Sequence, residues 1–229
     1  MYYDLHIHSA LSPCGDNDMT IHNILNMAKL KELDAVALTD HNSCRNTPAF
    51  LHVAKEIGIT ALAGMEINTA EEVHAVCLFP ALEDALLFDA YVYERLPAIK
   101  NDPAIFGEQR ILNEKDEIIG YEEKLLVNAT EISFFELHDL VRKYNGIYFP
   151  AHIDRASFSL LSNLGMVPED VLMDAYELSD LTKKEAIVEQ NKSLQDLPLM
   201  VNSDAHYLWD IAEPVQQLSA EIKEKLKLL

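Results

Sequence analysis

Short apolar runs of strand length recur along this chain of 229 residues, and stretches with helical periodicity separate them. This alternation is typical of parallel strands joined by crossover helices, so it predicts an α/β fold. Seven strands in such an alternation favour a barrel over an open sheet. We expect these strands at residues 2–7, 35–38, 60–67, 73–79, 146–150, 174–178 and 197–201.

Three of the expected helices carry signals at their ends. Thr20 precedes an apolar stripe with helical spacing and is suited to cap that helix. Ser133 and Glu136 have the spacing of a capping box for the helix that follows them. The last helix is expected from about residue 213 to residue 226, with Pro214 in its first turn.

One segment interrupts the alternation. From about residue 98 to residue 129 the composition becomes polar, and residues 101–103 indicate a turn. Residues 110–112 and 124–127 are candidates for a hairpin around residues 113–117. We therefore predict a single domain over residues 1–229, with a small inserted subdomain at about 98–129.

Composition narrows the class of protein. The three cysteines form an odd set without paired spacing, and no charged-then-apolar leader precedes Asp4, so we expect a cytoplasmic protein. No apolar run approaches the roughly 20 residues that span a bilayer, so we expect no membrane partner. With 38 acidic and 18 basic residues, the net charge of -20 opposes an extended nucleic-acid surface. The oligomeric state is left open.

Histidines gather at the ends of the predicted strands. Residues two apart in an extended strand face the same side, so His6 and His8 point together, as do Asp204 and His206. His74 stands near the start of its strand, which requires that strand to run the other way or to bend. Six of the nine histidines lie in or just after a strand: His6, His8, His41, His74, His152 and His206.

These residue types favour metal chemistry. Hydrolysis by serine or cysteine needs one nucleophile beside one base, which does not explain so many histidines on one rim. Imidazoles and carboxylates together bind divalent ions, and a site with two or three ions needs several of each. Glu66 and Asp40 supply carboxylates at two further strand ends. The sequence therefore predicts a multinuclear metal site where the strands end.

The chemistry-bearing motifs occur in a fixed order: His6-Ile7-His8, Thr39-Asp40-His41, Glu66, His74, His152 and Asp204-Ala205-His206. Over nearly the whole chain this order resembles the PHP (polymerase and histidinol phosphatase) family. The resemblance implies a distorted seven-stranded (β/α)7 TIM-like barrel, a cluster of divalent metal ions, often three, and phosphoesterase activity. In size the chain is similar to small bacterial PHP phosphoesterases rather than to the PHP domains of DNA polymerases.

The resemblance also implies which residues bind the ions. Glu66 would bridge the first two ions. Asp4 and Asp40 are expected to orient the metal-binding histidines as hydrogen-bond acceptors rather than to bind metal themselves. The implied ligands are His6, His8, Glu66 and Asp204 for the first ion, Glu66, His74 and His152 for the second, and His41 and His206 for the third.

The third ion needs one more ligand, an acid that family members supply shortly after the first motif. Here the loop is longer than the common one. Asp16 is favoured, because it lies four residues before Thr20. Cys14 and Asp18 stay open as alternatives, and a thiolate would shift the metal preference toward zinc.

The charge balance favours a phosphate ligand. Three divalent ions, three carboxylates including Asp16, and one bridging hydroxide leave about +2 at the site. Arg155 follows His152 by three residues and is suited to bind phosphate through its planar fork. Arg45, which follows His41, is a weaker second candidate.

The resulting hypothesis is a metal-dependent phosphoesterase. A metal-bridging hydroxide, held by Glu66 and its ions, would attack the phosphate ester of a small metabolite or nucleotide. The ions are expected to be zinc, manganese or iron. A nuclease acting on short oligonucleotides is one alternative, and a non-catalytic metal-binding module that serves regulation is another.

Overall fold

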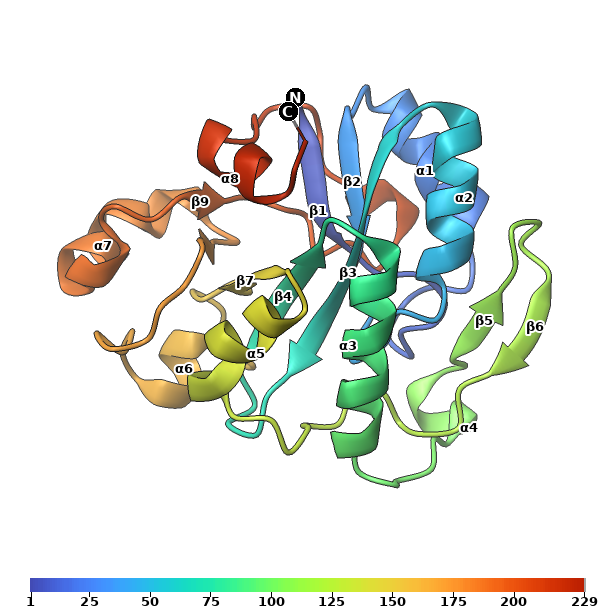
Figure 1. The fold of residues 1–229 in the computed structure, drawn as a ribbon, viewed down its shortest axis with the longest axis horizontal. Coiled ribbons are helices and arrows are strands. Elements are labelled where there is room, and N and C mark those ends of the chain that lie inside the picture. Colours follow the sequence, from blue (N-terminus) through green and yellow to red (C-terminus); the bar gives the residue numbers. More distant parts are fainter. Residues whose placement is uncertain (229) are drawn as a thin grey trace.

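The computed structural model describes residues 1–228 and shows a mixed α/β fold. Its central sheet has five strands that curl into a half-barrel (Figure 1). Every residue of four of these strands is buried, which explains why they appear in the sequence as continuous apolar runs rather than as alternating ones. In spatial order the strands are β1 (Tyr3–Ile7), β2 (Ala35–Leu38), β3 (Thr60–Asn68), β4 (His74–Phe79) and β7 (Ile147–Pro150).

The strands do not all run in one direction. β1, β2 and β3 are parallel, whereas β4 is antiparallel to both of its neighbours, β3 and β7. A crossover helix needs a dozen or more residues, and the link between Asn68 and His74 is too short for one. Thr69 closes this link as a tight turn, since its backbone N–H and hydroxyl donate to the carbonyl of Val73. The reversed strand that the position of His74 required is therefore confirmed.

The two remaining predicted strands form a separate parallel pair, β8 (Tyr176–Glu177) and β9 (Leu199–Met200). Single hydrogen bonds link this pair to the sheet on one side, for example from Ile153 N–H to the carbonyl of Glu177 at 2.9 Å. After β9, Ala205 bridges to Ile7 at the end of β1. All seven predicted strands are present, but the hydrogen-bonded ladders of residues 1–228 do not confirm a closed seven-stranded barrel.

Helices cover the outside of the sheet (Figure 1). The apolar stripe of α1 is buried, and α1 packs on α2, which contacts β3. α3 covers β3 and β4, and α5 packs on β7. Among residues 1–228, no helix combines the length and apolar character that crossing a bilayer requires. The helices are α1 (Ile21–Leu30), α2 (Thr47–Ile57), α3 (Leu82–Arg95), α4 (Pro103–Phe106), α5 (Leu137–Lys143), α6 (Leu160–Leu164), α7 (Lys184–Gln190) and α8 (Ala220–Lys225).

The inserted segment does form a hairpin, but its second strand was predicted wrongly. β5 (Arg110–Leu112) pairs with β6 (Ile118–Tyr121), not with residues 124–127. The side-chain oxygen of Asn113 accepts from the N–H groups of Lys115 and Glu117, so the chain turns back at once. Residues 124–127 instead pair with the start of the inserted segment: the N–H of Leu125 donates to the carbonyl of Ile99 at 2.8 Å.

The helix ends also depart from expectation. The last helix begins at Ala220 rather than at residue 213, because the preceding residues pair with the N-terminus, as in the bond from Leu218 N–H to the carbonyl of Met1. Thr20 precedes α1, but its hydroxyl donates to Asp116 instead of capping the helix. Ser133 caps a 3₁₀ turn (Phe134–Glu136) before α5, without the reciprocal bond of a capping box.

Candidate metal centre

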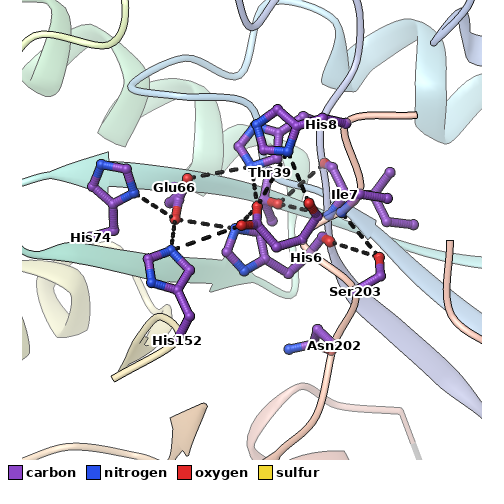
Figure 2. A network of polar contacts seen from close by, with 12 residues as sticks. His6, Ile7, His8, Thr39, Glu66, His74, His152, Asn202 and Ser203 are labelled. Atoms are coloured by element: carbon purple, nitrogen blue, oxygen red, sulfur yellow. Dashed lines mark hydrogen bonds and ion pairs between the residues drawn. The ribbon is translucent and has the colours of Figure 1, made fainter. Parts of the chain in front are cut away.

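Eight predicted ligands meet at one end of the sheet. β1 carries His6, and His8 follows it; His41 follows β2; Glu66 lies near the end of β3. His74 reaches the same end because β4 is reversed. The remaining three, His152, Asp204 and His206, lie in the loops after β7 and β9. Figure 2 shows the His6, His8, His74 and His152 side chains pointing toward Glu66.

Glu66 lies at the centre of the cluster. Only 1% of the residue is exposed. Burial alone would raise the pKa of its carboxyl group, but the surrounding imidazoles hold that pKa well below its ordinary value, so the group is ionised. The contacts to its oxygens are 2.9 Å from His41 Nδ1, 3.0 Å from His74 Nδ1, 3.2 Å from His6 Nε2, 3.2 Å from His152 Nε2 and 3.3 Å from His8 Nε2.

Asp204 is the second carboxylate of the cluster. One of its oxygens lies 3.0 Å from His8 Nε2 and 3.2 Å from His6 Nε2. Burial opposes its ionisation, yet these two imidazoles lower the pKa of Asp204 well below its ordinary value. Its backbone is left-handed, with φ of 53°, and so is that of His152, with φ of 31°. Such conformations are costly for residues other than glycine and gather at functional sites.

Several ligand atoms in the cluster are buried without a hydrogen-bond partner. Leaving a buried polar atom unpaired costs about 1–3 kcal/mol, and so many in one place indicate that something else satisfies them. A divalent metal ion does so, since neutral imidazole nitrogen and carboxylate oxygen are its protein ligands. Within residues 1–228 these atoms include His6 Nε2, His8 Nε2, His41 Nδ1, Glu66 Oε2 and Asp204 Oδ1; each lies within 3.3 Å of another of them but in an orientation that makes no hydrogen bond.

The geometry of the donor atoms also fits metal binding. Three groups of side chains each bring one donor atom within 4.8 Å of the others. Within residues 1–228, the first group is the set implied for one ion; the second contains His41 and not His152, and the third contains His8 and neither Asp16 nor Cys14. The groups are His6, His8, Glu66 and Asp204; His41, Glu66 and His74; and His8, His41 and His206.

Glu177 orients His6 and was not among the residues predicted from the sequence. This buried carboxylate lies 3.1 Å from His6 Nδ1, on the far side of the ring from Glu66. It also accepts hydrogen bonds from the backbone N–H of His152 and from the amide of Asn202. Glu177 ends β8, so its position at the carboxyl end of a predicted strand was the signal that would have found it.

The two acids expected to orient histidines do so only indirectly. Asp40 accepts from the hydroxyl of Ser12, and Ser12 lies 2.9 Å from His8 Nδ1. Asp4 accepts from the backbone N–H and hydroxyl of Ser203, and so holds the loop that carries Asp204. Both acids therefore support the site through a serine.

In the loop after β1, the structure brings Cys14 rather than Asp16 into the cluster. Cys14 Sγ lies 3.1 Å from His206 Nε2. Burial raises the pKa of this thiol, but His41 and His206 more than offset that effect and lower it to about 5. The carboxylate of Asp16 accepts from the N–H of Asp18, in the same loop. Asp18 itself is exposed.

A cavity of about 340 Å³ opens onto the cluster. Arg155 lines it; Nη1 of this side chain donates to Asp204, and Nε donates to Ser179 at 3.0 Å. Phe158 forms another part of the wall and stacks on the ring of His74, with centroids 5.0 Å apart. Arg155 therefore lies where the sequence predicted a phosphate ligand.

Arg45, the second candidate for phosphate, lies elsewhere. Its Nε lies 2.9 Å from a carboxylate oxygen of Glu122 in the inserted segment, and its guanidinium packs over Tyr93. It does not line the cavity beside the histidines. Arg45 therefore anchors the inserted segment.

Comparisons with known proteins agree with this architecture. The profile of the PHP domain matches residues 4–218. The uncharacterized protein MJ1587 of Methanocaldococcus jannaschii is 38% identical over 79 residues. That match covers 31% of this chain and 46% of the relative, so the chain spans less than half the length of this curated relative.

Three solved structures share the fold. A protein of Bifidobacterium adolescentis assigned as a metal-dependent phosphoesterase has a TM-score of 0.66 at 18% identity, covering 98% of this chain and 95% of that one. An amidohydrolase of Chromobacterium violaceum has a TM-score of 0.64 at 17% identity, covering 100% and 96%. A lesion-specific endonuclease of Pyrococcus furiosus has a TM-score of 0.61 at 21% identity, covering 90% and 48%. With the profile match extending over residues 4–218, this chain belongs to the PHP domain family.

Proposed function

We propose that this protein is a metal-dependent phosphoesterase that hydrolyses the phosphate ester of a small metabolite or nucleotide. One observation supports this most strongly: buried imidazole and carboxylate atoms without hydrogen-bond partners converge beside Arg155, at a cavity. The Bifidobacterium protein, which is similar over nearly its whole length, carries the same assignment. Both a metal-loaded cluster and the neighbouring guanidinium of Arg155 would attract an anionic phosphate ester.

Different groups of side chains would hold different ions. His6, His8, Glu66 and Asp204 form one site, and the carboxylate of Glu66 is shared with a second site containing His74. His152 Nε2 lies 3.2 Å from the same carboxylate and is proposed to complete that second site. Because their pKa values are held low, Glu66 and Asp204 are ionised and ready to bind cations.

Divalent ions at these sites would lower the pKa of water toward neutrality and neutralise charge on the phosphate oxygens. We assign the remaining steps to the chain itself. Glu177 holds the ring of His6 so that Nε2 faces the cluster. Arg155, oriented by Ser179 and with 42% of its side chain exposed, binds the phosphate from the solvent side. Phe158 shields His74 from solvent on one face.

The size of the cavity favours a small substrate. A volume of about 340 Å³ is near the lower end of ordinary small-molecule sites, which span roughly 300–1,000 Å³. The net charge of -20 gives no general attraction for a nucleic-acid backbone. A nuclease acting on short oligonucleotides is the second candidate, because the Pyrococcus endonuclease shares the fold.

A substrate panel tests the proposal. Metal-loaded protein is assayed with an aryl phosphate monoester, the corresponding diester, a set of nucleotides and a short oligonucleotide. His8→Ala and Asp204→Ala each remove a proposed ligand and are expected to lower hydrolysis at least about 100-fold. His52→Ala on the exposed face of α2 is the matched control and keeps the wild-type rate. Metal-loaded protein that hydrolyses none of these compounds contradicts the proposal.

A further inference from the structure

The third metal site lacks a carboxylate in this structure. His8, His41 and His206 bring one donor atom each within 4.8 Å of the others. The His8 and His206 rings stack with centroids 4.2 Å apart, and those of His8 and His41 lie 4.5 Å apart. Two of these residues, His8 and His41, are fully or nearly fully buried and each has a nitrogen without a hydrogen-bond partner. His8 has one free nitrogen, because its Nδ1 lies 2.9 Å from the hydroxyl of Ser12, and its Nε2 faces Glu66 and Asp204 of the first group. His41 and His206 alone therefore leave two positions open on a tetrahedral ion.

We propose that the sulfur of Cys14 fills one of these positions, so that the third ion is held by one thiolate and the imidazoles of His41 and His206, while His8 stays with the first ion. This inference rests on the proposed metal centre and goes beyond it, because a thiolate is a soft ligand that selects zinc over manganese. It also replaces Asp16, the ligand that the sequence favoured.

Distances support sulfur as a ligand. On one tetrahedral zinc ion, with Zn–S near 2.3 Å and Zn–N near 2.1 Å, sulfur and nitrogen lie about 3.6 Å apart. Cys14 Sγ and His206 Nε2 are 3.1 Å apart, so a small separation of the two atoms admits the ion between them. Cys14 also lines the cavity that holds His41, whereas Asp16 does not.

The loop holds Cys14 in place from two directions. Gly15 N–H donates to the carbonyl of Ser12, and a side-chain carbon on Gly15 would stand 2.5 Å from the carbonyl oxygen of Ser9, so only glycine permits this turn. On the other side, Asp16 N–H donates to the carbonyl of His206 at 2.9 Å. Asp16 thus contributes its backbone to the site and turns its carboxylate toward Asp18.

Cobalt substitution tests the assignment without relying on catalysis. The stripped protein is loaded with Co²⁺, bound cobalt is counted, and the near-ultraviolet sulfur-to-cobalt charge-transfer band is recorded. We expect the band in the wild type, its loss in Cys14→Ser, and its retention in Asp16→Asn. Cys14→Asp is expected to restore the cobalt count without the band. Zinc affinity of one site should fall about 100-fold in Cys14→Ser.

Thiol labelling gives a second readout. Cys44 and Cys77 are buried and Cys14 is exposed, so alkylation of the folded protein reports on Cys14. Bound zinc is expected to slow that alkylation in the wild type and in Asp16→Asn alike. Full cobalt occupancy without a charge-transfer band, or alkylation that zinc does not slow, overturns the inference while leaving the proposed function standing. A wild-type protein that binds no metal overturns both.

Discussion

Glu66 is the residue on which the centre depends most, because five imidazoles lie within 3.3 Å of its two oxygens. Its neighbours keep it charged in a place where burial alone would neutralise it. This arrangement supports the proposal that Glu66 is a ligand shared by two ions. Individual residues of this kind could be recognised in the sequence, since each follows an apolar run.

Residues that orient the proposed metal ligands, without binding metal themselves, were harder to predict from the sequence. Glu177 orients His6, yet 171 positions separate the two residues in the chain, and only the tertiary fold brings them together. The sequence favoured Asp16 over Cys14, and the choice between them could not be settled from the sequence for a similar reason. It depends on a loop turn and on a backbone bond to His206, and neither has a sequence signature.

At this scale we predict the effect of Glu177→Gln. The amide keeps the shape but loses the charge that holds His6 Nδ1, so affinity for the first metal ion should fall about 10–100-fold. Titration of the stripped protein with zinc measures this change. Glu189→Gln, an exposed residue of α7, should bind zinc like the wild type. Equal affinity in Glu177→Gln and the wild type would show that this carboxylate has no part in the centre.

At the scale of elements, short strands position the ligands, and the reversal of β4 is what brings His74 to them. All seven expected strands were found because buried strands form distinct apolar runs. Two boundaries were missed: the start of α8, where the preceding residues pair with the N-terminus, and the return of the hairpin at Ile118 instead of residue 124, where the side chain of Asn113 closes a local turn. Whether the strands close into a barrel could not be predicted either, since that depends on whether β8 and β9 hydrogen-bond to the five-stranded sheet.

We predict that Gly64→Ala disturbs β3 two residues before Glu66. The added carbon would stand 2.8 Å from Leu78 Cδ2, 2.9 Å from Thr39 Cγ2 and 3.0 Å from the carbonyl oxygen of Cys77. Overpacking of this kind costs about 1–3 kcal/mol, which lowers Tm by about 2–4 °C per kcal/mol in a chain of this size. Thermal unfolding measures the shift. Gly120→Ala in β6, with 3.7 Å to its nearest contact, is the control and should change Tm little.

At the scale of the whole molecule, the centre joins parts of the chain that are far apart. The proposed ligands extend from His6 near the N-terminus to His206 near the C-terminus. The loop that carries Asp204 and His206 also bridges to β1, through Ala205 and Ile7. Ions bound by these side chains would link the loops after β1, β7 and β9. Metal binding should therefore stabilise the entire fold and not only its active end.

Removal of the ions tests this coupling. An ion that binds only the folded state, at a free concentration of about 100 times its Kd, adds about 2.7 kcal/mol to the free energy of unfolding. A chelator should therefore lower Tm by about 5–10 °C. Differential scanning calorimetry before and after zinc is returned measures the shift. In Asp204→Ala, the difference in Tm between the stripped and the zinc-loaded protein is expected to be smaller. Identical Tm values for stripped and zinc-loaded wild type would contradict a structural link through the ions.

The proposed activity requires that the cluster around Glu66 is a metal centre that hydrolyses phosphate esters. The most direct measurement follows bound metal and hydrolysis of an aryl phosphate together while the stripped protein is titrated with zinc or manganese. We predict a rate that rises with the bound ions and stops rising when the sites are full, and a rate at least about 100-fold lower in Glu66→Gln. Full metal occupancy without hydrolysis, or an equal rate in stripped protein, would contradict the account.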